Sequence, residues 1–153
     1  MKRASGVRVR EASMADLPAL VAFNRAMALE TEGLRLAPAT LRRGVRAVLR
    51  DPARGFYLVA EREDRVVGQL MVIREWSDWR NGDWFWLQSV YVEPGARRQG
   101  VFRALHAEAA RRAARGGACG LRLYVERRNV RAQRTYRAFG MRETHYKLFE
   151  RAG

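Results

Sequence analysis

Hydrophobic and polar positions along the chain follow two different periods, and the shorter period predicts strands. Hydrophobic residues that alternate with polar ones, or that form short unbroken runs, are typical of strands with one or both faces buried. The sequence predicts six such strands, at residues 7–11, 56–60, 66–73, 84–92, 121–125 and 146–149. Glu63-Asp64 predicts a hairpin turn, whereas residues 75–83 are expected to form a loop.

The longer period, of three to four residues, predicts four helices. Ser, Asp and Asn are favoured at the start of a helix, Pro in its first turn, and Gly just after its end. The first helix is expected to start at Ser13 or Asp16 and to end at Gly33, and the second to run from Pro38 to Asp51. The third is expected to start at about Arg98 and to end at Gly116, and the fourth to run from Asn129 to Gly140.

Taken in order, these elements predict an α/β layered fold with a mixed, mainly antiparallel sheet. The length of 153 residues, without a repeat or a linker, favours a single domain over residues 1–153. With 48% hydrophobic and 30% charged residues, the composition excludes a disordered chain. No apolar run approaches the roughly 18 residues of a membrane span. Cys119 is the single cysteine and cannot form an internal disulfide, so we expect a cytoplasmic protein.

The net charge of +14 is unevenly distributed. Residues 1–93 hold 15 Lys and Arg against 12 Asp and Glu, whereas residues 94–153 hold 15 against 4. An arginine-biased composition accounts for part of the total net charge, but it explains the asymmetry between the two halves less well. A strongly cationic half indicates a polyanionic partner, either nucleic acid or a phosphate-rich ligand.

One segment, from Val90 to Leu105, combines the end of a predicted strand, a short basic loop and a glycine where a helix opens. At such a place the free backbone N–H groups and the helix dipole attract an anion, and glycine lets the backbone approach it closely. The segment lacks the Gly-Lys-Ser/Thr of a Walker A loop and the three spaced glycines of a dinucleotide-binding fingerprint. It therefore predicts a phosphate site of another kind.

Three features together resemble the GNAT superfamily of acyl-CoA N-acyltransferases over nearly the whole chain. They are the Val-x-Val of Val90 and Val92, the Arg-x-x-Gly of residues 97–100, and the Asn-x-x-Ala-x-x-x-Tyr-x-x-x-Gly of residues 129–140. The resemblance implies a sheet whose fourth and fifth strands splay apart to admit acetyl-CoA, and no metal. It implies acetyl transfer to a primary amine of a small molecule or peptide, by direct attack in a ternary complex.

The same resemblance implies the residues of the cofactor site. Backbone groups would contact the pantetheine arm, and the loop and helix start would contact the pyrophosphate. The residues concerned are Val90, Tyr91, Val92, Arg97, Arg98, Gln99, Gly100, Val101, Phe102, Arg103 and Asn129. Phe102 stands where the family usually has Gly or Ala, so its side chain must point into the core or the loop must shift.

Tyr136 would stand near the thioester sulfur as general acid, by the same resemblance. An unperturbed phenol has a pKa near 10 and is protonated at neutral pH, so it can protonate a departing thiolate. The alternative is packing, because Tyr136 shares an apolar stripe with Ala132 and Phe139.

The acceptor side is predicted from an aromatic and acidic segment. Four tryptophans, at positions 76, 79, 84 and 86, are interleaved with Glu75, Asp78 and Asp83. Aromatic faces and carboxylates suit an ammonium group, although Trp84 and Trp86 share a strand face and fit a core equally. No titrating group lies in Leu87-Gln88-Ser89, so the general base must come from elsewhere. The candidates are Glu30, Glu32, Glu75 and Asp78.

Two other functions stay open at this stage. The arginines of the C-terminal half fit a nucleic-acid-binding module, although no recognised nucleic-acid motif accompanies them. The second open function is that of a protein with the same fold that binds acyl-CoA without catalysis. The expected partners are acetyl-CoA and an amine, with no membrane, and a homodimer is left open.

Overall fold

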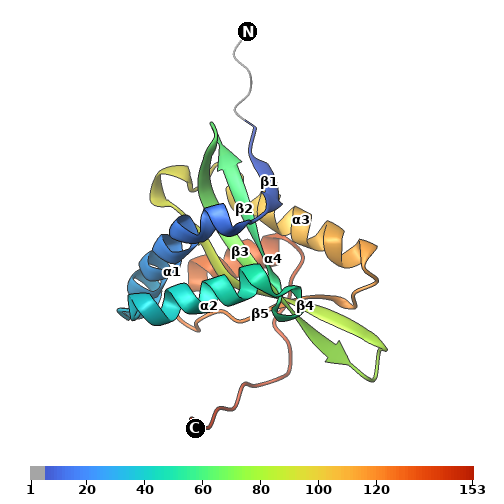
Figure 1. Cartoon of the computed structure of the whole chain (residues 1–153). Coiled ribbons are helices and arrows are strands. Elements are labelled where there is room, and N and C mark those ends of the chain that lie inside the picture. Colours follow the sequence, from blue (N-terminus) through green and yellow to red (C-terminus); the bar gives the residue numbers. More distant parts are fainter. Residues whose placement is uncertain (1–5) are drawn as a thin grey trace.

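The computed structural model describes residues 6–153, which form a five-stranded sheet with helices on both faces (Figure 1). Neighbouring strands follow the chain order, and they are β1 (Arg8–Glu11), β2 (Phe56–Arg62), β3 (Arg65–Ser77), β4 (Gly82–Val92) and β5 (Gly120–Leu123). The first four strands pair antiparallel, and β5 lies parallel to β4. The predicted mixed, mainly antiparallel α/β fold is confirmed.

The α-helices of the described residues are α1 (Leu17–Glu32), α2 (Pro38–Arg50), α3 (Val101–Arg115) and α4 (Val130–Ala138). Their ends lie where the sequence predicts them, with one exception. Helix α3 begins at Val101 and not near Arg98, because Arg98 and Gly100 have φ angles of 62° and 80°, which no helix tolerates. The residues before α3 therefore form a loop. None of the helices in residues 6–153 has the length and apolar character needed to cross a membrane.

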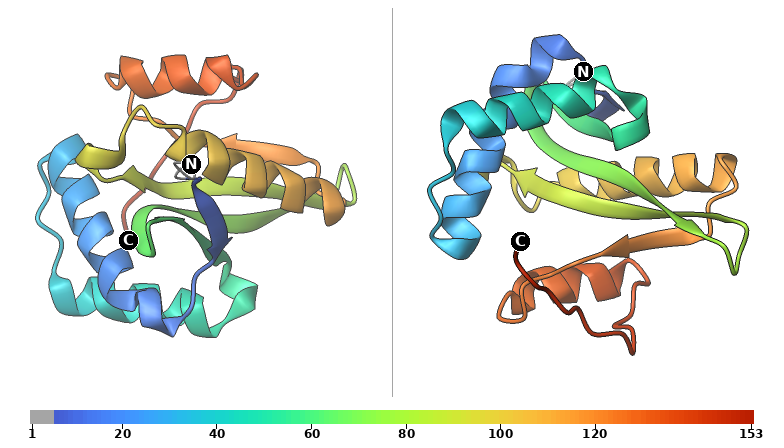
Figure 2. Two further views of the ribbon diagram at one scale, coloured as in Figure 1. Left: turned by 90° about the horizontal axis from the view of Figure 1, so that it is seen from above. Right: turned by 60° about the horizontal axis from the view of Figure 1, so that its bottom comes forward.

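Helix α3 covers one face of the sheet, and α1 and α2 cover the other (Figure 2). The alternation of side chains along β2 explains this layering. Leu58 packs in the cluster that includes Leu105 of α3, whereas its neighbour Val59 packs with Leu20 of α1. All four side chains are fully buried, and burial of each contributes about 2 kcal/mol. The sheet is thus fixed from both sides.

Two further sequence predictions are wrong. Residues 75–83 are not one long loop, because β3 continues to Ser77 and pairs with β4 from Gly82, which leaves only a tight hairpin turn. This hairpin stands clear of the core (Figure 1), so its strands need no buried hydrophobic face. Residues 146–149 form no strand and lie in an irregular C-terminal segment. Tyr146 lies near Arg122 of β5, at 5.9 Å from its guanidinium carbon, but the segment pairs with no strand within residues 6–153.

Candidate active site

The site begins where β4 and β5 separate. Their pairing ends at Leu87 and Leu123, whereas β4 continues to Val92. This splay of the fourth and fifth strands is the one that the family resemblance implies. Just beyond it, β4 carries two residues, Ser89 and Val90, opposite the single Leu70 of β3. Such a bulge bends the strand and redirects its backbone groups.

A buried set of polar side chains holds this bulge. Ser89 has a φ of 50°, which is rare for a residue other than glycine. Gln69 on β3 is fully buried, and its Nε2 donates a hydrogen bond of 3.0 Å to the main-chain oxygen of Ser89. The phenol of Tyr57 on β2 lies close to the side chains of Ser89 and of Asn24 on α1, and burial raises its pKa. Polar side chains from three other elements therefore surround one strained residue.

Sequence reasoning missed this polar set. The signal was present, because Gln69 interrupts the hydrophobic run from Val66 to Ile73. A polar side chain in such a run must find a hydrogen-bond partner in the core. Its Oε1 atom is shielded from solvent and has no partner among the described residues.

The N-terminus of α3 lies beside the splay. Gly100 is its N-cap residue in the left-handed region, and no side chain caps the helix. The first turn of a helix has N–H groups without an internal acceptor. A Cβ at Gly100 would have no atom within 4 Å, so the space in front of this turn is open. At Gly68 a Cβ would lie 2.9 Å from Val101 Cγ1, so glycine there lets α3 approach β3.

Cationic side chains surround this turn. Arg98 is exposed, and the guanidinium of Arg103 lies over the ring of Phe139 at 5.1 Å. Arg62 at the end of β2 donates a hydrogen bond to the side chain of Gln99, which in turn donates from Nε2 to the Gly95 oxygen at 3.1 Å. Sequence reasoning missed Arg62, because only the fold brings the end of β2 to this loop.

Arg97 is engaged within the protein. Its Nε donates to the Val92 oxygen at 2.8 Å, and a terminal nitrogen pairs with Glu30 of α1 at 2.7 Å. The hydroxyl of Tyr91 donates to the other oxygen of Glu30 at 3.1 Å, and burial is the main reason for the raised pKa of this phenol. Arg97, Tyr91 and Glu30 therefore tie the end of α1 to β4.

Phe102 points away from the loop and toward α4. Its ring centroid lies 5.7 Å from that of Tyr136, 5.4 Å from that of Phe139 and 6.0 Å from that of His106. Of the two expected arrangements, the structure thus shows the inward side chain. Burial raises the pKa of Tyr136 and lowers that of His106. This packing places Tyr136 against the first turn of α3.

A hollow of about 590 Å³ lies between the end of α1 and the segment that joins β5 to α4. Its lining residues are Glu30, Thr31, Glu32, Glu126, Arg128 and Asn129. Asn129 caps α4 as predicted, its Oδ1 accepting from the Ala132 N–H at 3.2 Å. Glu126, which sequence reasoning missed, accepts from the Arg128 N–H at 2.7 Å. The hollow thus collects three carboxylates, two of them predicted.

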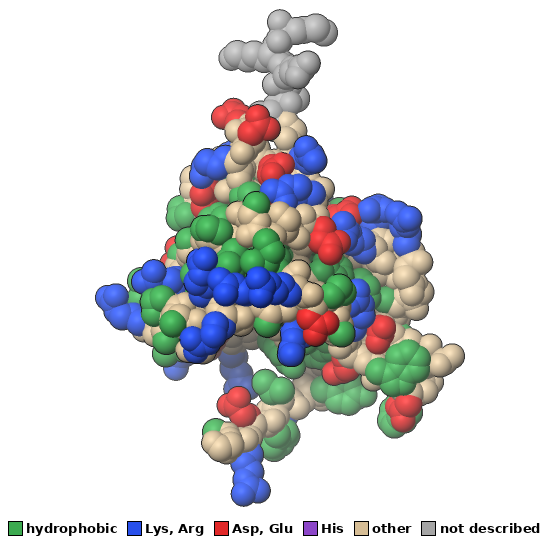
Figure 3. All heavy atoms as spheres, in the orientation of Figure 1, with side chains coloured by type: hydrophobic (Ala, Val, Ile, Leu, Met, Phe, Trp, Pro, Cys, Tyr) green, Lys and Arg blue, Asp and Glu red, His purple; other side chains and the backbone are tan. Residues whose placement is uncertain are grey.

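Glu75 and Asp78 lie elsewhere, on the hairpin between β3 and β4. Glu75 accepts from Arg122 at 3.2 Å, and Asp78 accepts from the Trp79 N–H at 2.9 Å. With about 3.3 Å per strand residue, Asp83 near the start of β4 is about 23 Å from Val90. Figure 3 shows hydrophobic and acidic side chains at the tip of the hairpin, where Trp79 is 86% exposed. The structure does not bring Glu75 and Asp78 together with Tyr136.

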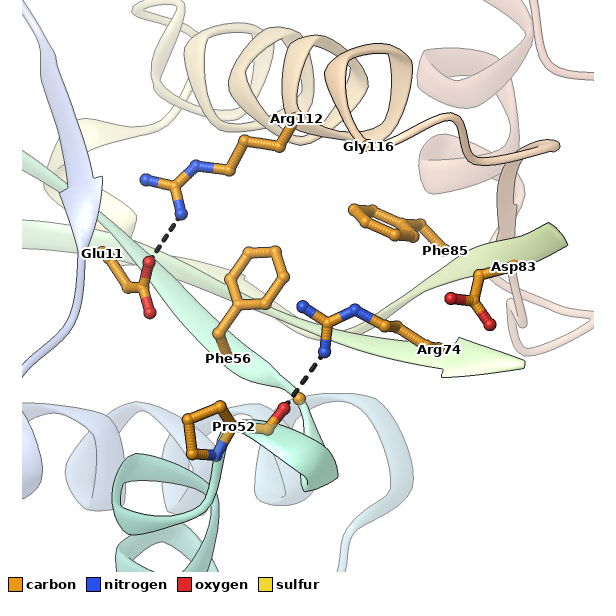
Figure 4. Close-up of a pocket in the computed structure, with 9 residues that line it drawn as sticks. Glu11, Pro52, Phe56, Arg74, Asp83, Phe85, Arg112 and Gly116 are labelled. Atoms are coloured by element: carbon orange, nitrogen blue, oxygen red, sulfur yellow. Dashed lines mark hydrogen bonds and ion pairs between the residues drawn. The ribbon is translucent and has the colours of Figure 1, made fainter. Parts of the chain in front are cut away.

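A second hollow, of about 280 Å³, lies toward the C-terminal end of α3 (Figure 4). The guanidinium groups of Arg74 and Arg112 each lie 5.4 Å from the centre of the Phe56 ring. Arg112 is paired with Glu11 at 2.6 Å, and Arg74 donates to the Pro52 oxygen at 3.1 Å. Both cations therefore have protein partners. Within residues 6–153 no three His, Cys, Asp or Glu side chains are grouped as metal ligands.

The model of the acetyltransferase (GNAT) family matches residues 20–141. A solved structure of a possible acetyltransferase from Clostridium difficile 630 is 41% identical, covers 96% of this chain and 97% of its own, and superposes with a TM-score of 0.90. The chain therefore belongs to the GNAT family of acetyltransferases.

Two further solved structures share the fold at lower identity. A predicted acetyltransferase from Clostridium acetobutylicum, solved with acetyl-CoA, is 16% identical, and the match covers 95% of this chain and 96% of that chain with a TM-score of 0.78. Aminoglycoside N-acetyltransferase AAC(6')-Iy in complex with CoA is 17% identical, and the match covers 99% of this chain and 98% of that chain with a TM-score of 0.80. No curated protein matches the chain.

Proposed function

We propose that the protein is an acetyl-CoA-dependent N-acetyltransferase that acts on a primary amine by direct attack in a ternary complex. The observation that carries the proposal is the uncapped, glycine-opened N-terminus of α3 beside the bulge of β4, at the point where β5 leaves the sheet. A helix start of this kind binds phosphate, and a splayed strand has free backbone groups for an extended ligand.

The residues around α3 fit the pyrophosphate of acetyl-CoA. The space in front of Gly100 is open, and the exposed Arg98 lies in the same loop. Arg62 and Arg103 add positive charge from β2 and from α3. Arg97 differs, because its guanidinium is already bound to Glu30 and to the Val92 oxygen. We therefore assign Arg97 to holding the loop and Arg98 to the phosphates.

The reactive end of the ligand would lie at the bulge. When bound, acetyl-CoA supplies an acyl thioester there. We assign the Val90 N–H, presented by the bulge, to polarising the carbonyl oxygen, because a fixed donor aimed at developing charge lowers the barrier. We assign Tyr136 to donating its phenol proton to the departing sulfur. Its raised pKa keeps that proton in place at neutral pH.

The acidic hollow fits the amine. Carboxylates at its mouth attract an ammonium group and can accept the proton that the amine must lose before attack. Glu30 is held by Tyr91 and Arg97, whereas Glu32 makes no hydrogen bond or ion pair within residues 6–153. We therefore assign Glu32 as the leading acceptor-side carboxylate, with Glu126 beside it.

Two measurements test this function. Calorimetry with acetyl-CoA should show binding in the micromolar range. Turnover against a panel of primary amines, followed as free thiol, should then identify an acceptor. Binding without turnover of any amine would support a non-catalytic acyl-CoA-binding protein instead.

A third measurement tests whether the protein binds duplex DNA. Arg111 and Arg112 are paired with Glu108 at 2.6 and 2.8 Å, so part of the arginine-rich surface is already neutralised. We expect no salt-sensitive DNA binding that competes with acetyl-CoA. Tight DNA binding without acetyl-CoA binding would contradict the proposed function.

A further inference from the structure

Helix α2 carries a row of arginines that the proposed acetyltransferase site does not use. Arg42, Arg46 and Arg50 follow one another at intervals of four residues, and Arg43 lies beside them. Side chains four residues apart are neighbours on one side of a helix, so the four cations form a single strip. Figure 3 shows Lys and Arg side chains gathered over this helix. We call these four side chains the α2 arginine row.

The α2 arginine row is not neutralised within the protein. Residues 34–54 hold six arginines and one acid, Asp51, which pairs with Arg54 at 3.3 Å. Within residues 6–153 the side chains of the row make no ion pair, and the Nε of Arg46 is shielded from solvent without an acceptor. Like charges four residues apart destabilise a helix by repulsion. An anionic partner would remove this repulsion.

Packing of the apolar side of α2 fixes where the row lies. The side chains of Leu41, Val45, Val48 and Leu49 pack in the cluster that includes Leu20 of α1. The helix therefore cannot turn its arginines inward. Because α2 and α3 cover opposite faces of the sheet (Figure 2), the row is also separated from the glycine-opened start of α3. It is thus a second cationic surface, distinct from the proposed phosphate site.

The surroundings of the row favour a nucleic acid over an acidic protein or a membrane. Of the large hydrophobic side chains that are exposed within residues 6–153, none belongs to α2. Protein interfaces depend on a few buried aromatic or apolar anchors, and a membrane-bound helix inserts an apolar face. Phosphate contacts need only positive charge, and successive arginines of the row lie about 6 Å apart along the helix. A regular phosphate backbone suits this regular row.

We propose that the α2 arginine row binds the phosphate backbone of a nucleic-acid duplex. Each arginine that contacts a phosphate releases a condensed counterion, so the binding depends on salt and not on base sequence. A duplex fits better than a single strand, because proteins that bind single strands stack the bases on aromatic side chains and α2 has none. The surface is independent of the proposed acetyl transfer, and bound acetyl-CoA should leave it free.

The charge count along the sequence hides this surface. Residues 1–93 are almost balanced, with 15 cations against 12 anions, because acids of other elements offset the six arginines of residues 34–54. The fold separates the two, since the acid-free helix α2 presents its arginines together. The C-terminal arginines differ, because Arg111 and Arg112 are paired with Glu108.

Fluorescence anisotropy with a labelled DNA duplex, measured over a series of salt concentrations, tests the proposal. The full chain should bind two duplexes of unrelated sequence equally, with or without saturating acetyl-CoA. The triple variant Arg42→Gln/Arg46→Gln/Arg50→Gln should weaken this binding about tenfold or more and lower the slope of log K against log salt by about 2 to 3. Glutamine is a good helix former, so the variant should fold, which a melting curve would show. Its affinity for acetyl-CoA should match that of the wild type.

The matched control is Arg8→Gln/Arg115→Gln/Arg151→Gln, which removes the same charge at exposed positions scattered over β1, the end of α3 and the C-terminal segment. It should keep most of the affinity and of the salt slope. Equal losses in both variants would overturn the proposal, because they would assign the binding to the net charge of +14 alone. So would a wild-type chain that does not bind the duplex, or binding that acetyl-CoA displaces.

Two further probes separate the other polyanions. Polyglutamate and vesicles of an anionic phospholipid are titrated against the wild type and the triple variant under the same conditions. We expect neither to bind through the row as tightly as the duplex does. Tighter binding of either probe, lost in the triple variant, would assign the row to an acidic protein or to a membrane and overturn the proposal.

Discussion

Gln69 and Ser89 are joined across two strands by a hydrogen bond of 3.0 Å, from the buried side-chain amide of Gln69 to the main-chain oxygen of Ser89. Ser89 has a positive φ, and Val90 follows it in the bulge. A buried donor thus holds the residue before the proposed oxyanion contact. If this bond positions the Val90 N–H, its loss should affect catalysis more than cofactor binding.

We predict that Gln69→Met lowers kcat about tenfold to a hundredfold, since removing an oxyanion donor outright costs more. The KM for acetyl-CoA should change little. The loss of stability should be about 1 kcal/mol, which a melting curve would show. Val45→Ala on α2 is the control, because it removes about 2 kcal/mol of packing from a buried position on an element that does not carry the bulge. Equal kcat losses in both variants would assign the effect to stability.

Gly100→Glu should abolish acetyl-CoA binding while the protein still folds. A negative side chain at this position blocks and repels an anion at the start of α3. Gly117→Glu is a matched control, because Gly117 has a φ of 69° and equally open space beyond its Cα, but lies at the other end of α3. Calorimetry should show binding by the Gly117 variant only. Unchanged binding by a folded Gly100→Glu protein would move the phosphate site elsewhere.

Tyr136→Phe should lower kcat about tenfold to a thousandfold with little change in acetyl-CoA affinity, as expected for a general acid. Burial raises the pKa of Tyr136, so the phenol keeps its proton to a higher pH than an exposed tyrosine does. Any loss of wild-type kcat from this group should therefore begin at a higher pH than it would for an exposed tyrosine. An unaffected kcat in the variant would leave Tyr136 a packing residue against Phe102.

Glu32→Lys should raise the KM for the best amine about tenfold or more, because it replaces attraction of the ammonium group by repulsion. Asp78→Lys makes the same type of charge reversal at the tip of the β3–β4 hairpin and should leave this KM unchanged. Steady-state kinetics of both variants, with acetyl-CoA saturating, separates the two acceptor positions that the sequence left open. The reverse result would place the amine at the hairpin.

Glu108 should make stability depend on pH under acidic conditions. Hydrogen bonds from Arg111, and then from Arg112, lower the pKa of Glu108 to about 2. The carboxylate therefore stabilises the fold at a pH above 4.5, which is the ordinary pKa of this group, and this contribution is lost as the pH falls from 4.5 toward 2. Since Arg111 is half exposed, we expect Glu108→Gln to cost about 1 kcal/mol at pH 7.

The melting temperature of Glu108→Gln should lie about 3 °C below that of the wild type at pH 7, and the difference should shrink by pH 3. Glu143→Gln is the control, because Glu143 is 87% exposed and its ion pair with Arg137 is long, at 4.0 Å. A difference that stays constant with pH would mean that the Glu108 carboxylate does not act through its charge.

The sequence by itself determined the order of the elements and most helix ends. Gly33, Asp51, Gly116 and Asn129 act through their own backbone preferences or caps, which depend on few neighbours. The motif from Val90 to Leu105 likewise indicated a phosphate site, because a glycine-opened helix start is a local feature. Local chemistry can be read from neighbouring residues.

Only the tertiary structure decided which of these residues meet. It turned Phe102 toward Tyr136 and engaged Arg97 with Glu30. It also placed Asp78 at the far end of a long hairpin, and Glu126 beside Glu32. Each of these relations joins residues far apart in the chain, and strand register and helix packing set their distances. The last predicted strand failed for the same reason, because a strand requires a partner as well as a pattern.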